Sequence, residues 1–144
     1  MSAMDKVLEA AAILENSPVL VEWCAEVGLD SPSVIYPADD LNPEGESSAP
    51  WIVLNPESGS GGLEAEKLTG FIGLDIGIRE KDPKTGVKQV WQLYAKVIDV
   101  LVKNNFPVCR ADYDFDVSSR SPLRVVYSDI YFNETRAVGR ENVL

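Results

Sequence analysis

Three aspartates at alternate positions have the spacing in this chain that most resembles a metal-binding motif. Asp112, Asp114 and Asp116 match the start of a calcium-binding loop, in which every second residue is a ligand. That loop also requires glycine at its sixth position and glutamate at its twelfth, where this chain has Val117 and Leu123. Aromatic residues separate the aspartates, as in an alternating β-strand. We therefore expect the aspartates to line one exposed strand face, and we predict no metal site.

A glycine-rich stretch at residues 58–62 could be mistaken for a phosphate-binding loop. A P-loop ends in Gly-Lys followed by Ser or Thr, and a dinucleotide-binding turn opens into a helix. This stretch has no such ending and leads into a strand-like pattern. We expect a flexible loop here and predict no cofactor.

Catalytic groups are not indicated by the remaining residue types. The chain has no histidine, which is the commonest general base and the commonest transition-metal ligand. Any two of its 23 acidic residues could approach each other as in a glycoside hydrolase, but no spacing singles out a pair. We predict that the protein is not an enzyme and has no catalytic residues.

The acidic charge is concentrated in the first half of the chain. The net charge is −10; residues 1–64 contain twelve acidic residues and one basic residue, Lys6, whereas residues 65–144 are nearly neutral. Such an excess argues against a nucleic-acid reader, which needs a concentrated basic face. The excess is explained either by a solvated acidic surface or by an acidic surface that meets a basic one on a partner or a second copy.

Two oppositely charged groups are candidates for contacts between subunits. A head-to-tail ring repeats one contact, so one face of the subunit can be acidic and the opposite face basic. The alternative is that both groups are exposed and independent. The acidic group lies in the loop at residues 39–49, and the basic group lies around residues 79–88. The interface candidates are Asp39, Asp40, Glu44 and Glu46 on the acidic side and Arg79, Lys81, Lys84 and Lys88 on the basic side.

Hydrophobic periodicity predicts three helices and five strands in the order α-α-β-β-β-α-β-β. Helical spacing of apolar residues and a Ser17-Pro18 start signal mark the helices, and alternation marks the strands. A turn is expected at residues 81–86. This pattern predicts an α+β fold with a mixed or antiparallel sheet of about four to five strands and helices mainly on one face. The predicted helices cover residues 4–15, 18–27 and 87–105, and the strands cover residues 33–36, 50–54, 69–78, 110–117 and 123–132.

The strand at residues 69–78 differs between its two faces. One face carries four aliphatic residues in alternation, and the other includes Gly73, Asp75 and Gly77. Interior glycines mark either a local change of sheet shape or the close approach of another backbone. Gly73 and Gly77 are therefore candidates for contact with another subunit, with sheet curvature as the alternative.

The length of 144 residues is typical of one domain, which we assign to residues 1–144. No stretch approaches the ~20 apolar residues of a membrane span. Residues 134–144 lack periodicity and are predicted to form a mobile tail, in which Arg136 and Arg140 are candidates for ordering on a partner. Cys24 and Cys109 lie in apolar surroundings, and we expect both to be buried thiols.

The order of these elements resembles that of the tail terminator (tail completion) proteins of long-tailed bacteriophages. A helical pair ends near residues 20–23, a short strand follows at residues 34–37, and a Pro-aromatic-aliphatic strand follows at residues 50–54. A glycine-rich segment then leads to the long alternating strand and to the helix around residues 90–97. The resemblance extends from residue 4 to about residue 132.

The resemblance implies a structural role in the virion. Proteins of this family form a hexameric ring on the last ring of the tail tube, stop its polymerisation, and present a surface to the head-completion (stopper) protein. Their expected location is the tail or neck, after assembly in the host cytoplasm, and DNA passes through the ring without specific binding. An acidic lumen suits that passage because it repels phosphate. The family has no short residue signature, so the interface candidates above depend on charge alone.

Two other classes remain open from the sequence. One is a different head–tail connector of the virion. The other is an acidic protein-binding module unrelated to phages, which would stay monomeric or dimeric and bind a basic partner.

Overall fold

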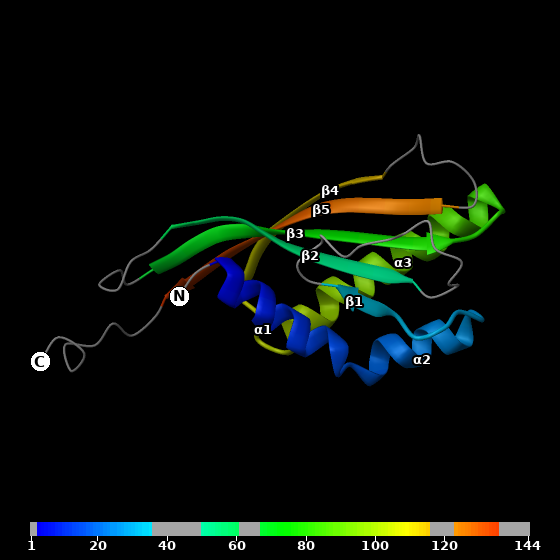
Figure 1. The fold of residues 1–144 in the computed structure, drawn as a ribbon, viewed down its shortest axis with the longest axis horizontal. Coiled ribbons are helices and arrows are strands. Elements are labelled where there is room, and N and C mark those ends of the chain that lie inside the picture. Colours follow the sequence, from blue (N-terminus) through cyan, green and yellow to red (C-terminus); the bar gives the residue numbers. More distant parts are fainter. Residues whose placement is uncertain (1–2, 36–49, 61–66, 116–122, 136–144) are drawn as a thin grey trace, which may run out of the picture.

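The computed structural model describes residues 3–35, 50–60, 67–115 and 123–135 of the chain (Figure 1). This part contains three helices and five strands in the predicted order, which confirms the α+β class. The helices are α1 (Ala3–Glu15), α2 (Pro18–Glu26) and α3 (Pro83–Lys103). The strands are β1 (Ser33–Ile35), β2 (Trp51–Ser60), β3 (Lys67–Arg79), β4 (Val108–Phe115) and β5 (Leu123–Thr135).

The five strands form one mixed sheet in the order β1-β2-β3-β5-β4. β1 pairs with β2 in parallel, and the other neighbours are antiparallel, including the hairpin of β4 and β5. β3 lies at the centre and pairs with β5 along its whole length. β4 therefore forms one edge of the described sheet and β1 the other.

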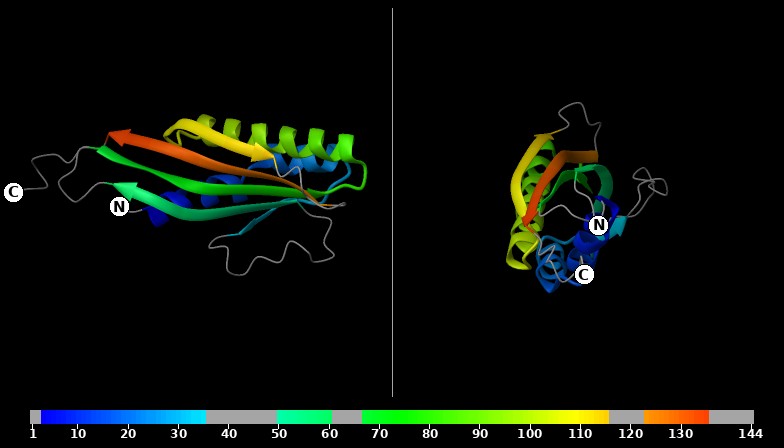
Figure 2. Two further views of the ribbon diagram at one scale, coloured as in Figure 1. Left: turned by 90° about the horizontal axis from the view of Figure 1, so that it is seen from above. Right: turned by 90° about the vertical axis from the view of Figure 1, so that its left-hand side faces the viewer.

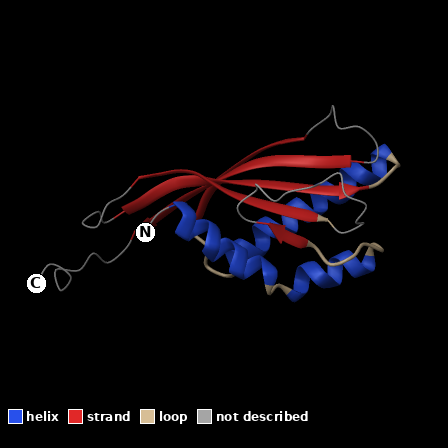
Figure 3. Cartoon of the chain, in the orientation of Figure 1, coloured by secondary structure: helices blue, strands red, loops and turns tan. Residues whose placement is uncertain are grey.

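The helices cover one face of this sheet, as predicted (Figures 2 and 3). α1 packs against β2, and α3 packs against β3 and β5. The β3 side chains on this face are fully buried, as are the apolar residues of α3 that face them. The buried β3 row consists of Ile72, Leu74, Ile76 and Ile78.

Two consecutive hydrogen bonds link α3 to β5 and β4, the last two strands at one edge of the sheet. The Tyr94 hydroxyl and Ser128 Oγ are 2.8 Å apart, and Ser128 Oγ donates to the Asp112 carbonyl oxygen at 2.8 Å. Because the serine proton is used on that carbonyl, Tyr94 is the donor in the first bond. Burial raises the pKa of Tyr94 above its ordinary value, which keeps its hydroxyl protonated as a donor.

α3 begins at Pro83, four residues earlier than predicted. The expected turn at residues 81–86 is therefore wrong for residues 83–86, which are helical. Asp82 is the N-cap, and its carboxylate accepts a hydrogen bond from the Thr85 backbone N–H at 3.0 Å. Pro83 then occupies the first helical turn, where its missing N–H costs nothing. Arg124 from β5 holds the preceding turn by donating to the carbonyl oxygens of Glu80 and Lys81, each at 3.2 Å.

β2 is longer than predicted, and the expected loop at residues 58–62 is partly wrong. Residues 58–60 continue the strand by pairing with residues 69–71 of β3, after a register shift between Pro56 and Ser58. Pairing with a long neighbouring strand overrides the weak strand preference of serine and glycine. Residues 61 and 62 lie outside the described residues. Residues 134 and 135 of the predicted tail likewise belong to β5, and the rest of that tail lies outside the described residues.

The two cysteines differ in exposure. Cys24 is buried, but Cys109 is exposed, so the expectation of two buried thiols is wrong for Cys109. Cys109 lies at a register shift of the edge strand, between Val108 and Arg110, where the regular alternation of inward and outward side chains is interrupted. Its thiol donates to the Tyr131 carbonyl oxygen at 3.4 Å.

We predict that a thiol reagent labels Cys109 in the native protein and labels Cys24 only after unfolding. Burial shields Cys24 and raises the pKa of its thiol to about 11, so little reactive thiolate forms at neutral pH. Mass spectrometry after timed labelling measures both sites. Cys109→Ser serves as the control and should leave no fast-reacting thiol, whereas rapid native labelling of Cys24 would contradict the packing described.

The close approach suggested by the central glycines is made at Gly77 by the chain's own Trp51. These residues are register partners on the face of the sheet away from the described helices, and a Cβ on Gly77 would overlap the Trp51 ring. A Cβ on Gly73 would instead lie 2.7 Å from Oε1 of Glu57, the movable end of a side chain. Contact of a second chain at Gly73 and Gly77 stays a prediction.

We therefore expect Gly77→Ala to lower the free energy of unfolding by about 2–3 kcal/mol, because the indole cannot move without leaving its packed position. The matched variant Gly73→Ala should change it by less than about 1 kcal/mol, since Glu57 can rotate away. Urea denaturation measures both. Adding Trp51→Leu to Gly77→Ala should recover part of the loss, and equal effects of the two alanine variants would count against this explanation.

Candidate functional site

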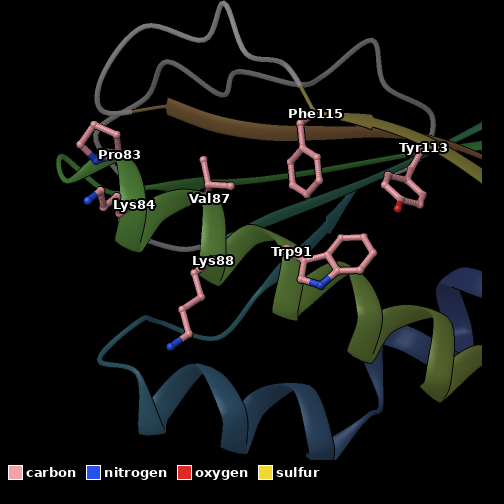
Figure 4. Close-up of a pocket in the computed structure, with 7 residues that line it drawn as sticks. All are labelled: Pro83, Lys84, Val87, Lys88, Trp91, Tyr113 and Phe115. Atoms are coloured by element: carbon pink, nitrogen blue, oxygen red, sulfur yellow. The ribbon is translucent and has the colours of Figure 1, made fainter.

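An apolar groove lies between α3 and the edge strand β4 (Figure 4). Its volume is about 680 Å³. α3 contributes Pro83, Val87 and Trp91, which are spaced four residues apart and so share one stripe of the helix. β4 contributes Tyr113 and Phe115, which alternate with aspartates and so point to the helix side of the sheet.

Trp91 is the centre of an aromatic cluster at one end of the groove. Its ring centroid lies 5.0 Å from that of Tyr113, 5.7 Å from that of Phe115 and 5.8 Å from that of Tyr94. Tyr94 is the residue anchored to Ser128, so the cluster is tied to the buried core. Aromatic pairs at these separations stabilise one another beyond the area they bury. The groove therefore has a preformed aromatic floor.

The apolar side chains of the groove are unusually accessible. Val87 is 48% exposed, Tyr113 is 46% exposed and Trp91 is 38% exposed. Single exposed apolar residues are common on protein surfaces, but several that adjoin one another and line a hollow indicate a binding surface. The groove is thus the strongest candidate for an interaction site among the described residues.

The groove also adjoins a free sheet edge. Among the described residues, β4 pairs only with β5, so its other edge presents backbone N–H and C=O groups without strand partners. Such edges accept an additional extended segment unless they are blocked. The site therefore offers both an apolar floor and backbone hydrogen-bonding groups beside it.

The charge of the groove is opposite to that of the whole chain. Among the described residues, Lys84 and Lys88 are its charged lining residues, and none of its described lining side chains is acidic. Both lysines are exposed on the α3 rim, where Lys88 extends away from β4 (Figure 4). On a chain with a net charge of −10, this rim favours a segment that carries carboxylates.

The face of the sheet away from the described helices carries a second, acidic hollow of about 380 Å³. Its carboxylates come from four strands, and none of its described lining residues is basic. Arg110 lies beside it, paired with Asp112 at 3.3 Å and stacked 4.0 Å from the Tyr131 ring centroid. The acidic lining residues are Glu57, Asp75, Asp112, Asp114 and Asp129.

Asp75 has the most perturbed carboxyl of this hollow. Burial in the middle of β3 is the main cause, and the charges of Glu57 and Asp129 add to it; together they raise its pKa to about 6. The group therefore titrates near neutral pH. No general acid or base partner of known catalytic geometry accompanies it among the residues lining the hollow, and we assign it an electrostatic effect on stability.

The predicted site residues are distributed as follows. Asp112 and Asp114 lie exposed on one strand face, as expected, and Asp116 lies outside the described residues. Among the described residues, no three His, Cys, Asp or Glu side chains are grouped so that they could hold a metal ion. Within the same ranges, no helix is long and apolar enough to cross a membrane.

Only two of the four basic interface candidates lie at the groove. Lys84 and Lys88 line it, whereas Arg79 ends β3 and Lys81 lies in the turn before α3. The candidates that lie outside the described residues are Asp39, Asp40, Glu44, Glu46, Arg136 and Arg140.

The aromatic floor was missed by sequence reasoning. Trp91 widens the apolar sector of its helix beyond the buried stripe, next to Val87 and Ile98, and this extra width was the available signal that it faces something other than the core. Tyr113 and Phe115 were recognised only as the apolar side of a strand.

Comparison with protein-family models and with curated proteins gives no match for this chain.

We predict that Asp75 makes the protein less stable as the pH rises from about 4 to about 6. The folded pKa of about 6 exceeds the ordinary value of 3.8, so the native state binds more protons than the unfolded state in this window. Such a change in pKa corresponds to at most about 3 kcal/mol. Because Asp75 is only half-buried, screening by solvent should reduce the effect to about 1 kcal/mol.

Asp75→Asn should therefore raise the free energy of unfolding by about 1 kcal/mol at pH 7.5 and have little effect at pH 4. Denaturant unfolding at several pH values measures this difference. Asp114→Asn, on the exposed part of the same hollow, is the control and should change stability by less than about 0.5 kcal/mol. An unchanged pH profile in Asp75→Asn would refute the assignment.

Proposed function

We propose that this protein is a structural subunit that assembles with copies of itself into a ring, in the manner of phage tail terminators. In this role it caps the tail tube, stops its polymerisation and joins the tail to the head-completion complex. The observation that carries the proposal is the lysine-rimmed apolar groove beside a free sheet edge on an otherwise acidic chain. A surface of this kind favours association over catalysis.

The charge pattern supports a head-to-tail contact over a two-fold one. Pairing of two β4 edges would bring Asp112 and Asp114 of one copy near those of the other, and like charges across paired strands are destabilising. A head-to-tail contact instead joins two different surfaces and closes into a ring when the rotation permits. The basic rim on one surface and the acidic residues elsewhere fit that arrangement.

The acidic face of the sheet is suited to line the central channel of such a ring. Its five carboxylates would repel the phosphates of passing DNA, so that DNA moves through without binding. The element order α-α-β-β-β-α-β-β, on which the resemblance to tail terminators is based, is the observed order. Expected partners are therefore other copies of the chain, the tail tube protein and the head-completion protein, in the tail or neck of a virion.

An acidic protein-binding module unrelated to phages is the second candidate. It is favoured by the net charge of −10, which suits a basic partner whether or not the chain assembles with its own copies. The two candidates differ in oligomeric state.

We predict a closed ring of about six copies at low salt that loosens at high salt. Raising the salt from about 0.1 M to about 1 M shortens the Debye length from about 10 Å to about 3 Å, which weakens contacts between exposed charges. Native mass spectrometry, light scattering and images of large species measure the assembly.

A salt-insensitive ring and a strict monomer are the two alternative results. A ring insensitive to salt would keep the proposed function and contradict the charge contact. A monomer at every protein and salt concentration, with no ring in images, would contradict the ring and favour the binding module.

A further inference from the structure

The groove between α3 and β4 has physical properties that restrict what can occupy it. Its floor is aromatic, its rim carries Lys84 and Lys88, and a free strand edge adjoins it. An occupant that satisfies all three must supply apolar side chains, carboxylates and an extended backbone.

We propose that the groove binds residues 36–47 of a neighbouring copy, with Leu41 on the aromatic floor and the flanking carboxylates at the lysine rim. This inference rests on the proposed assembly and names the contact that holds it together. In this contact, burial of Leu41 adds to the attraction between the carboxylates and the lysines.

Charge distinguishes this segment from the other parts of the chain that lie outside the described residues. Residues 36–49 contain four acidic residues and no basic one, whereas residues 61–66 contain two acidic residues. Residues 116–122 are neutral overall, and residues 136–144 contain two arginines and one glutamate. The lysine rim therefore favours residues 36–49 most strongly and disfavours the C-terminal segment.

The apolar and proline content of the segment also fits the groove. Leu41 provides an apolar side chain for the aromatic floor. Pro37 and Pro43 disfavour helical angles in the residues before them, so an extended backbone suited to a strand edge is expected. A proline-containing segment still pairs on one side, because only alternate N–H groups face the neighbouring strand.

Geometry favours the groove of another copy over that of the same chain. The segment starts after β1, and the groove lies at the opposite edge, four strand spacings or about 19 Å across the sheet. Fourteen residues that leave and return reach at most about 24 Å. Such a path leaves almost no residue to lie in the groove, whereas a neighbour can present the segment without this restriction.

Disulfide trapping between two separate variants tests the proposal directly. Both carry Cys109→Ser to remove the exposed thiol; one also carries Leu41→Cys and the other Val87→Cys, at the half-exposed groove position. Mixing them under mild oxidation should give a cross-linked dimer on non-reducing gels. The matched control replaces Val87→Cys with Lys96→Cys, on the same helix but outside the groove, and should give little dimer.

The energetic contribution of the rim is tested by charge reversal in the full chain. Lys88→Glu should weaken assembly at about 0.1 M salt roughly tenfold, because it places a carboxylate against carboxylates. Lys96→Glu makes the same charge change two turns along α3 and should change assembly less than about twofold. Native mass at a series of protein concentrations measures both.

The outcomes separate this inference from the proposed function. A ring that forms without the Leu41–Val87 cross-link, and equally in Lys88→Glu and Lys96→Glu, would keep the ring and overturn the groove contact. A cross-link between variants without any closed ring would support the groove contact and contradict the ring. A cross-link confined to single chains of the Leu41→Cys/Val87→Cys double variant would overturn binding between copies.

Discussion

The central strand β3 sets the constraint that the rest of the structure satisfies, because its two faces require opposite surroundings. One face carries four aliphatic side chains that are fully buried under α1 and α3. Burial of each such side chain contributes about 1.5–3 kcal/mol. The other face has glycines and Asp75 at the alternating positions, and there Trp51 from β2 packs over Gly77. α1 and α3 therefore cover the aliphatic face of β3, and β2 brings Trp51 to the glycine-containing face.

The groove follows from how α3 is attached to this sheet. Asp82 caps the helix, Arg124 holds the turn before it, and Tyr94 bonds to Ser128 beneath its middle. These contacts hold the Trp91 side of α3 beside the edge strand, where Tyr113 meets it. A site whose walls are already held in place loses little conformational entropy on binding, which favours association.

The electrostatics of the molecule separate two surfaces with different roles. The sheet face away from the described helices gathers carboxylates, where burial and then the charges of Glu57 and Asp129 raise the pKa of Asp75. The described part of the groove rim carries lysines and no carboxylate. On electrostatic grounds, the groove rim favours acidic partners and the carboxylate-rich face disfavours polyanions.

The sequence alone determined the fold class and the element order, since alternation and helical spacing are set by contacts within each segment. Only the tertiary structure decided where pairing extends a weak strand, as at residues 58–60, and where a register shift exposes Cys109. The tertiary structure also decided the position of the groove. Trp91 and Tyr113 belong to different elements, and they meet only because β4 pairs with β5 while α3 crosses beneath them. Local periodicity cannot specify contacts between segments whose relative position depends on the packing of the whole sheet.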